Sequence, residues 1–478
     1  MAFHVPSEEV AVPVFGEVIE VRSPATGEVL GTVPVADDAR VAAAIAAARA
    51  GRRRMADLPA HARARLLTTV AERINARHEE LSRLLATENG KPVEQTRGEV
   101  RAAVNIFLGF AEETKRLFGR QVPLDVSPGL EHHLAFTIRE PLGVVAAIVP
   151  FNYPVELYAY KAAAALAAGN AVVVKPPEKC PLTVDEVGRI VVDAGAPEGA
   201  HQVVHGGPDV ARALAASPDI QMISLTGSTA AGRAVAELAA ATLKKVQLEL
   251  GGNDAMIICA DADVDKAAEA IVLGRLARGN GQICCAVKRI YVEDAVYDEL
   301  AANLTERAKR LRVGDPLDDD TDVGPLITEA AARDVEAAVR RAVAGGAHLA
   351  AGGVREGNFV HPTVLTDVRA DEPEIAKEIF GPVAPLVRVT DAEEALRLAN
   401  DSDFGLQAAI FTRDINRAFS IARRLEVGSV IINGSTALRS EHLPFGGPKN
   451  TGGSRESLHD TLLEMTEEKT IIVMEAFA

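Results

Sequence analysis

The spacing of hydrophobic positions changes several times along the chain. Over residues 37–117, apolar side chains recur every three or four positions among Ala, Arg, Leu and Glu, which predicts a layer of amphipathic helices. Residues 131–139 instead alternate, with Leu134, Phe136 and Ile138 on one side, which predicts a strand in a protruding or edge hairpin. The amino-terminal part is therefore expected to be mostly helical and to lead into a small β-element.

From Gly143 onward the pattern switches to short β-branched runs separated by helical stretches. Strands are predicted at 144–149, 171–175, 222–226 and 246–250, and helices between them at 157–168, 184–194 and 230–243. Strands that alternate with helices form parallel sheets through right-handed crossovers, and such sheets bind ligands at the carboxyl ends of their strands. This segment is therefore typical of a nucleotide-binding domain.

A second alternating region covers residues 255–432 and predicts another α/β domain. Its strand-like runs lie at 290–292, 360–364 and 429–432. The run 469–474 near the carboxyl terminus reads as a short apolar strand without an obvious local partner. Because an unpaired apolar edge invites pairing with another chain, an oligomer is expected.

Composition and charge narrow the class of protein. The chain has 478 residues, and one hydrophobic core stops growing at roughly 250 to 300 residues, so at least two domains are expected. A net charge of −16 without a basic stripe argues against a nucleic-acid partner. No apolar run approaches the ~20 residues of a spanning helix, and no basic signal region opens the chain. We therefore expect no membrane partner and a cytoplasmic location.

The four cysteines are too few for a disulfide framework, so reduced thiols are expected, and no His, Cys or carboxylate residues cluster at metal-ligand spacing. Cys284 stands out because it follows a glycine turn in Gly281-Gln282-Ile283-Cys284-Cys285, which can present a thiol at a site. Taken alone, a free cysteine is more often buried packing than a nucleophile. Whether Cys284 is a nucleophile therefore depends on which other residues surround it.

Two polar residues at the ends of predicted strands fit chemistry at such a thiol. Glu249 lies just before a glycine pair, where burial would raise its pKa towards neutrality and suit it to activating water; a solvated strand-end carboxylate is the alternative. Asn152 lies between Pro150 and Pro154, which restrict the backbone and fix the direction of the amide. An oriented amide N–H can stabilise an oxyanion by about 2.7 to 4 kcal/mol, although the motif alone could equally be a turn.

Two further strand ends predict a dinucleotide site. A carboxylate at Glu178, three residues after Lys175, can accept from both ribose hydroxyls and would repel a 2'-phosphate, which favours NAD over NADP. Gly227 and Ser228 open the helix predicted at 230–243, whose first amides can face a pyrophosphate. Arg233 stands where a phosphate-binding P-loop needs lysine, which disfavours kinase or NTPase chemistry.

These motifs, in this order, resemble the aldehyde dehydrogenase superfamily over residues 21–473. The segments that carry the resemblance are 150–154, 175–178, 225–228, 248–253, 281–284, Glu378-Ile379-Phe380-Gly381-Pro382-Val383 and Pro444-Phe445-Gly446-Gly447. The resemblance implies an α/β fold with two Rossmann-like doubly wound domains and a small β oligomerisation element, in a homodimer or homotetramer. The implied boundaries are 1–119 and 141–251 for the cofactor-binding domain, 252–450 for the catalytic domain, and 120–140 and 459–478 for the oligomerisation element.

The same resemblance implies NAD-dependent oxidation of an aldehyde to a carboxylic acid. Cys284 would attack the aldehyde, Asn152 and the Cys284 backbone N–H would hold the oxyanion, and Glu249 would activate water against the thioester. Lys161 matches a lysine near the oxyanion site. The residues implied to hold NAD, with NADP as the alternative, are Pro150, Lys175, Glu178, Gly227, Ser228, Leu250, Glu378 and Phe380.

The sequence leaves the aldehyde open. Arg278 resembles an arginine that binds the substrate carboxylate in succinic semialdehyde dehydrogenases, but Tyr160 replaces a second arginine of those enzymes. Tyr153 lies in a segment similar to non-phosphorylating glyceraldehyde-3-phosphate dehydrogenases, but Ile283 replaces an arginine expected to touch phosphate. Glu156, if ionised, would disfavour an anionic substrate. Semialdehyde and hydroxyaldehyde substrates both stay as alternatives.

Two departures from the family pattern affect the region near the thiol. The interval from Glu249 to Cys284 is 35 residues (284 minus 249), one longer than expected, which implies an insertion near 278–280 and leaves Cys285 as a minor rival nucleophile. Ser454 replaces a glycine of the family pattern without a functional explanation from the sequence. Thioester transfer to coenzyme A is disfavoured because Glu249 is present, and a non-enzymatic structural role is disfavoured because Cys284 and Asn152 are intact.

Overall fold

The amino-terminal part of the chain forms a hairpin followed by four helices. The computed structural model describes residues 16–477. Strands β1 (Val18–Arg22) and β2 (Val29–Pro34) pair antiparallel. The next elements are α1 (Asp38–Ala56), α2 (Ala60–Ala76), α3 (His78–Asn89), α4 (Val93–Glu113) and the short turn η1 (Thr114–Arg116). The predicted helical layer is confirmed, whereas the β1–β2 hairpin was not predicted.

A five-stranded parallel sheet follows, in the order β7-β6-β5-β8-β9. Its strands are β5 (Val144–Ile148), β6 (Ala171–Lys175), β7 (His201–Val203), β8 (Met222–Thr226) and β9 (Lys245–Glu249). Its helices are α5 (Pro154–Ala168), α6 (Leu182–Asp193), α7 (Pro208–Ala216) and α8 (Thr229–Ala240). Alternate residues of β5 enter different cores: Val145 packs with α5, and Val144 packs with α1 and α7. Helices therefore cover both faces, as in a doubly wound fold.

The second half of the chain builds a seven-stranded sheet in the order β12-β15-β16-β11-β10-β17-β18, parallel except for β12. Its strands are β10 (Asp254–Ile258), β11 (Val287–Glu293), β12 (His348–Ala351), β15 (Thr363–Thr366), β16 (Val383–Val389), β17 (Gln407–Phe411) and β18 (Ser429–Ile432). Its helices are α9 (Val264–Ile271), α10 (Asp294–Arg310), α11 (Glu329–Ala344), α12 (Pro373–Ala376), α13 (Ala392–Asn400) and α14 (Ile415–Ala422). The strand predicted at 360–364 is wrong as one element.

That segment instead contains two strands. Strand β14 (Phe359–Val360) pairs with β13 (Arg355–Glu356) in a separate hairpin, and β15 joins the large sheet. Pro362 lies between them and carries no backbone N–H for a sheet ladder, so the apolar run is interrupted there.

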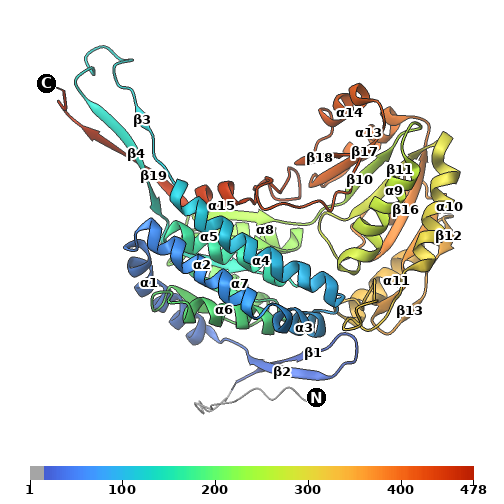
Figure 1. Cartoon of the computed structure of the whole chain (residues 1–478), viewed down its shortest axis with the longest axis horizontal. Coiled ribbons are helices and arrows are strands. Elements are labelled where there is room, and N and C mark those ends of the chain that lie inside the picture. Colours follow the sequence, from blue (N-terminus) through green and yellow to red (C-terminus); the bar gives the residue numbers. More distant parts are fainter. Residues whose placement is uncertain (1–15, 478) are drawn as a thin grey trace.

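A three-stranded arm protrudes from the body of the molecule (Figure 1). It contains β3 (Gln121–Val122), β4 (Leu134–Pro141) and β19 (Thr466–Val473), in the order β19-β4-β3, and α15 (Leu458–Glu464) leads into it. As expected, the last strand has no partner close in sequence among the described residues; β19 instead pairs antiparallel with β4 along its whole length. The two strands lie far apart in sequence, so local patterning could not reveal the pairing. One edge of β19 has no partner strand among residues 16–477.

The chain passes from the five-stranded to the seven-stranded sheet between β9 and β10, and it returns between β18 and α15, which packs with α5. The strands of the seven-stranded sheet lie on the right of Figure 1. Among residues 16–477, no helix is long and apolar enough to cross a membrane. The crossing segments bring strand ends of both sheets together, which is where the candidate site lies.

Candidate active site

The backbone turns sharply before it reaches the two adjacent thiols. Helix α9 continues into the π-helical segment Val272–Ala277, whose wider turns take up more residues than an α-helix. Residues 279–281 then have three consecutive positive φ angles, of 58°, 54° and 73°. The Asn280 amide anchors this turn by donating to the carbonyls of Gly90 (3.0 Å) and Pro325 (2.9 Å). Residues 278–280, where the sequence predicts an insertion, thus belong to a firmly held turn, and the insertion itself stays a prediction.

Cys284 and Cys285 differ in exposure and in electrostatics. Cys284 is partly exposed and Cys285 is buried. A hydrogen bond between the thiols lowers the pKa of Cys285 to about 6, supported by the cations Arg278 and Arg439, and raises the pKa of Cys284, to which burial also contributes. The pair therefore loses one proton easily, and Cys284 is the more exposed of the two thiols.

Asn152 is held by a buried network that comes from the helical layer. Its amide nitrogen donates to the Gln282 carbonyl (3.1 Å), two residues before Cys284, and its own carbonyl accepts from Lys91 Nζ (2.7 Å). Lys91 also forms a fully buried ion pair with Glu99, which in turn accepts from the Val155 N–H (2.8 Å) at the start of α5. These bonds fix Asn152 against the thiol loop.

Glu249 ends β9 and is buried, and neither of its carboxylate oxygens has a hydrogen-bond partner within the described residues. Burial raises its pKa well above the ordinary value, Glu456 adds to the rise, and Lys161 and Arg439 oppose it. A carboxyl group with free oxygens and a raised pKa can exchange a proton with water near neutral pH.

Lys161 is a buried cation that lowers the pKa of Glu249 and pairs with a second buried carboxylate. Lys161 Nζ pairs with Glu456 (3.2 Å), and Arg439 pairs with the other oxygen of Glu456 (2.7 Å). Burial alone would raise the pKa of Glu456, but Lys161 and Arg439 hold it below its usual value. Glu456 is therefore an ionised bridge between two cations, and Lys161 does not reach the cavity itself.

One cavity gathers about half of the candidate residues, and both sheets contribute to it. The predicted residues that line it are Asn152, Tyr153, Glu156, Glu249, Leu250, Arg278, Ile283, Cys284 and Cys285. It is also lined by Thr226, whose buried hydroxyl has no hydrogen-bond partner in the described chain. The remaining cofactor candidates, Pro150, Lys175, Glu178, Gly227, Ser228, Glu378 and Phe380, do not line this cavity.

Those remaining candidates lie around the carboxyl ends of the five-stranded sheet and on the segment after α12. Lys175 ends β6, and Glu178 lies against Gly207, where an added Cβ would approach the carboxylate to 3.1 Å. Ser228 caps α8 by accepting from the Ala231 N–H (3.2 Å), and Gly227 precedes it. A ribose fits beside the Glu178 carboxylate, where Gly207 has no side chain. A pyrophosphate fits at the N-terminus of α8.

Glu378 and Phe380 lie just before β16 of the seven-stranded sheet and close to the thiol loop. Glu378 pairs with Lys288 (3.0 Å), whose ammonium also donates to the carbonyls of Cys284 and Gly252. Phe380 packs edge-on against Phe151, 6.0 Å between ring centroids. A Cβ on Gly251 would come within 2.6 Å of the Glu378 carboxylate, so glycine at this position lets the backbone approach Glu378 closely. These residues also fit a bound dinucleotide.

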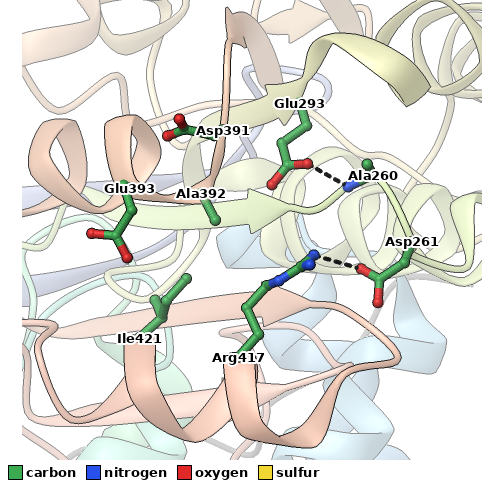
Figure 2. A pocket seen from close by; sticks show the side chains of 8 residues that line it. All are labelled: Ala260, Asp261, Glu293, Asp391, Ala392, Glu393, Arg417 and Ile421. Carbon is green, nitrogen blue, oxygen red and sulfur yellow. Dashed lines mark hydrogen bonds and ion pairs between the residues drawn. The ribbon is translucent and has the colours of Figure 1, made fainter.

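A second hollow lies at the carboxyl ends of β10 and β11 in the seven-stranded sheet (Figure 2). Two of its charged groups form an ion pair, Arg417 with Asp261 (3.1 Å), and Glu293 accepts from the Ala260 backbone N–H (2.8 Å). None of its lining residues is shared with the thiol cavity. It is therefore not the candidate site for the aldehyde.

Comparisons with known proteins identify the family. Residues 13–471 match the model described as "Aldehyde dehydrogenase family". The chain belongs to the aldehyde dehydrogenase family. It is therefore an oxidoreductase of a family that acts on small-molecule aldehydes with NAD(P) through a cysteine thiohemiacetal, which confirms the resemblance, the fold class and the enzyme class predicted from the sequence.

Three relatives illustrate the likeness. The chain is 41% identical over 409 residues to 3-sulfolactaldehyde dehydrogenase of Priestia aryabhattai, covering 85% of each protein. It is 39% identical to succinate-semialdehyde dehydrogenase [NADP(+)] of Escherichia coli, covering 92% of this chain and 91% of the relative. Its fold is similar to that of the NADP-dependent glyceraldehyde-3-phosphate dehydrogenase of Bacillus halodurans, complexed with NADP, with a TM-score of 0.93, 40% identity and 96% coverage of both chains.

Several residues of this site were not found from the sequence. Lys91, Glu99 and Lys288 hold Asn152 and the thiol loop, and Arg439 lines the cavity, yet each lies outside the recognised motifs. Ser454, which had no explanation, accepts from the Leu248 N–H (2.9 Å) and so supports β9 one residue before Glu249. Only its position in a motif close to the carboxyl terminus hinted at a role.

Proposed function

We propose that the chain oxidises an aldehyde to a free carboxylic acid with NAD(P), using Cys284 as nucleophile and Glu249 as base. The observation that carries this proposal is that Cys284, Asn152 and Glu249 line one cavity although they come from three distant segments. A nucleophile, an oxyanion donor and a base around one space are what acyl chemistry on an aldehyde requires.

The residues have distinct roles in this reaction. The Cys284 thiolate forms a C–S bond to the aldehyde carbon, and the Asn152 amide and the Cys284 backbone N–H stabilise the oxyanion of the thiohemiacetal. When bound, NAD(P) supplies the acceptor for the hydride. Loss of this hydride turns the thiohemiacetal into a thioester. Glu249 then takes a proton from water as the water oxygen attacks the thioester carbon, the C–S bond breaks, and the acid leaves.

Hydrolysis rather than thioester transfer can be tested directly. We expect the purified protein to form one carboxylic acid for each NADH when it is given an aldehyde and NAD without coenzyme A, because Glu249 activates water as the acceptor. Acid and NADH would be quantified in the same samples. Production of NADH only when coenzyme A is added would contradict the hydrolytic assignment.

Preference for NAD over NADP is a second part of the proposal and rests on Glu178. A carboxylate near the adenosine ribose accepts from its hydroxyls and repels a 2'-phosphate, so kcat/KM is expected to be roughly tenfold or more higher with NAD. Glu178→Gln keeps the size of the side chain and should narrow this ratio. The names of two relatives mention NADP. A wild-type kcat/KM that is higher with NADP than with NAD would refute the preference proposed for this chain.

We also propose the three-part division of the subunit given above and a homodimer or homotetramer built on the arm. The free edge of β19 supports this, together with exposed apolar side chains at its end, namely Ile472, Val473, Met474 and Phe477. A strand edge with apolar neighbours is suited to pairing with a second copy. The cytoplasmic location stays a prediction.

A further inference from the structure

Two segments of the active site meet through their backbones. The thiol loop (281–285) and the segment 378–383, which carries two of the cofactor candidates, lie against each other so closely that a Cβ on Gly281 would come within 2.3 Å of the Gly381 carbonyl carbon. The first segment carries the proposed nucleophile Cys284. The separation of the two segments therefore sets how a hydride that leaves an aldehyde on Cys284 meets its acceptor.

One buried ammonium joins both segments to the stretch of chain just after Glu249. Lys288 lies in β11, and its side chain is 1% exposed. Its Nζ donates to the carbonyls of Cys284 and Gly252 (2.8 Å for Gly252), and it pairs with Glu378 (3.0 Å). A lysine ammonium has three N–H donors, so these three acceptors use all of them.

The segments on either side of this ammonium have anchors of their own. Arg275, fully buried in the π-helical segment, donates to the carbonyls of Ile379 (2.9 Å) and Val383. On the other side, a Cβ on Gly252 would lie 2.8 Å from the Cys284 carbonyl oxygen, so glycine lets these two backbones come together. The lysine ammonium therefore bridges segments that are each held by further contacts.

The charge of Lys288 also acts on the reactive thiol. The hydrogen bond with Cys285 and burial raise the pKa of Cys284, and the cations Lys288 and Arg439 oppose that rise. Asp254 faces the same ammonium: burial raises its pKa, and Lys288 opposes this rise as well. An uncharged side chain in place of Lys288 would therefore leave the Cys284 thiolate less stable.

We propose that Lys288 is a positioning residue for hydride transfer, which fixes the separation between Cys284 and the cofactor candidate Glu378. This inference rests on the proposed function and adds to it a residue outside the recognised motifs. A misplacement of about 1 Å between reacting groups can cost roughly 10²-fold in rate. Loss of Lys288 should therefore slow the formation of NADH more than the hydrolysis of the thioester.

The first test uses the protein without cofactor. Alkylation of Cys284 by a substrate-like reagent is followed against pH, with the modified residue mapped by mass spectrometry. In Lys288→Met the alkylation should begin at higher pH than in the wild type, because a cation beside the thiol is lost. Lys288→Arg keeps the charge and should stay close to the wild-type profile. An unchanged profile in Lys288→Met would place the ammonium away from the thiol and overturn the inference.

A second variant keeps this test decisive if Lys288→Met does not fold. Glu378→Gln removes the carboxylate that pairs with Lys288 and leaves the ammonium in place. The unneutralised cation should then favour the thiolate more strongly, so alkylation of Cys284 should begin at lower pH, opposite to the shift in Lys288→Met. Alkylation that begins at higher pH in Glu378→Gln, or at the same pH as in the wild type, would overturn the link between Glu378 and the thiol.

The hydride step itself is tested by rapid mixing with NAD. The substrate is whichever of butanal, 4-oxobutanoate and benzaldehyde the wild type oxidises fastest, used with hydrogen or with deuterium on its carbonyl carbon. The first turnover of NADH should be roughly 10- to 100-fold slower in Lys288→Met, and deuterium should slow it further. Lys288→Arg should restore part of the rate.

Two results of this experiment would overturn the positioning role. They are a first turnover of Lys288→Met as fast as that of the wild type, and a slow one whose rate does not respond to deuterium. No NADH from any aldehyde with the wild-type protein would instead refute the proposed function.

Arg63→Met is the matched control for the loss of a cation that holds backbone carbonyls. Arg63 donates to the carbonyls of Ala167 (2.9 Å) and Leu58 (2.7 Å), near the end of α5 that is distant from Asn152. Both Arg63→Met and Lys288→Met should lower the thermal midpoint. Only Lys288→Met should change the alkylation profile and the first turnover, and equal changes in the two variants would show that Lys288 acts only through stability.

Discussion

Cys284→Ser is expected to lower kcat for aldehyde oxidation by roughly 10³-fold or more, because an alkoxide is far harder to form than a thiolate at neutral pH. The effect should be seen as loss of NADH production with folding intact, checked by an unchanged melting temperature. Cys284 faces the cavity with partial exposure, so the substitution changes chemistry more than packing.

The control that decides between the adjacent thiols is Cys285→Ala. We expect turnover to stay within about tenfold of wild type, because Cys285 is buried and packs against Ile283 and Phe445. Cys285→Ala removes the hydrogen bond and the neighbouring negative charge that raise the pKa of Cys284, so alkylation of Cys284 by a substrate-like reagent should begin at lower pH than in the wild type. Mapping the alkylated residue to Cys285 in the wild-type protein would overturn the assignment of Cys284.

Several short strands whose ends are marked by turns were predicted to the residue. Examples are β6 (Ala171–Lys175), β8 (Met222–Thr226) and β18 (Ser429–Ile432). In each, a short β-branched or apolar run is closed by polar or glycine-rich segments, so local pattern and final structure agree. The short strand β7 (His201–Val203) has no such pattern and was missed. Its place at the edge of the sheet depends on β6 and not on its own sequence.

The candidate site also contains some residues that the sequence revealed and others that it did not. Cys284, Asn152 and Glu249 lie in local motifs that could be read from the sequence, and the family resemblance implied that they act together at one cavity. Lys91 and Arg439 act through contacts with segments that are distant in sequence, Lys91 on the carbonyl of Asn152 and Arg439 on Glu456. No periodicity or motif records such contacts, and a charged residue in a helix or loop is usually solvated.

Glu249→Gln is expected to uncouple the two halves of the reaction. The thiol still attacks and NADH still forms once per active site, but the thioester then hydrolyses at least roughly 10²-fold more slowly, because an amide cannot take a proton from water. Rapid mixing should therefore show a burst of one NADH per Cys284 followed by a slow steady state, with acylated protein visible by mass spectrometry. Loss of the burst, or an unaltered steady state, would refute the role of Glu249 as base.

The acidity of Glu249 sets the pH dependence of the same step. Its pKa is raised by burial, so the active ionised form is lost as pH falls through a value well above the ordinary carboxyl range. Steady-state kcat of the wild type should therefore decline on acidification while thioester hydrolysis limits the rate, and the amplitude of the burst should not follow that decline. Glu293→Gln is the matched control, since Glu293 is a buried strand-end carboxylate in the second hollow, and it should preserve both the burst and the pH profile. A wild-type profile that stays flat through the neutral range down to the ordinary carboxyl pKa would show that Glu249 is not the group that limits hydrolysis.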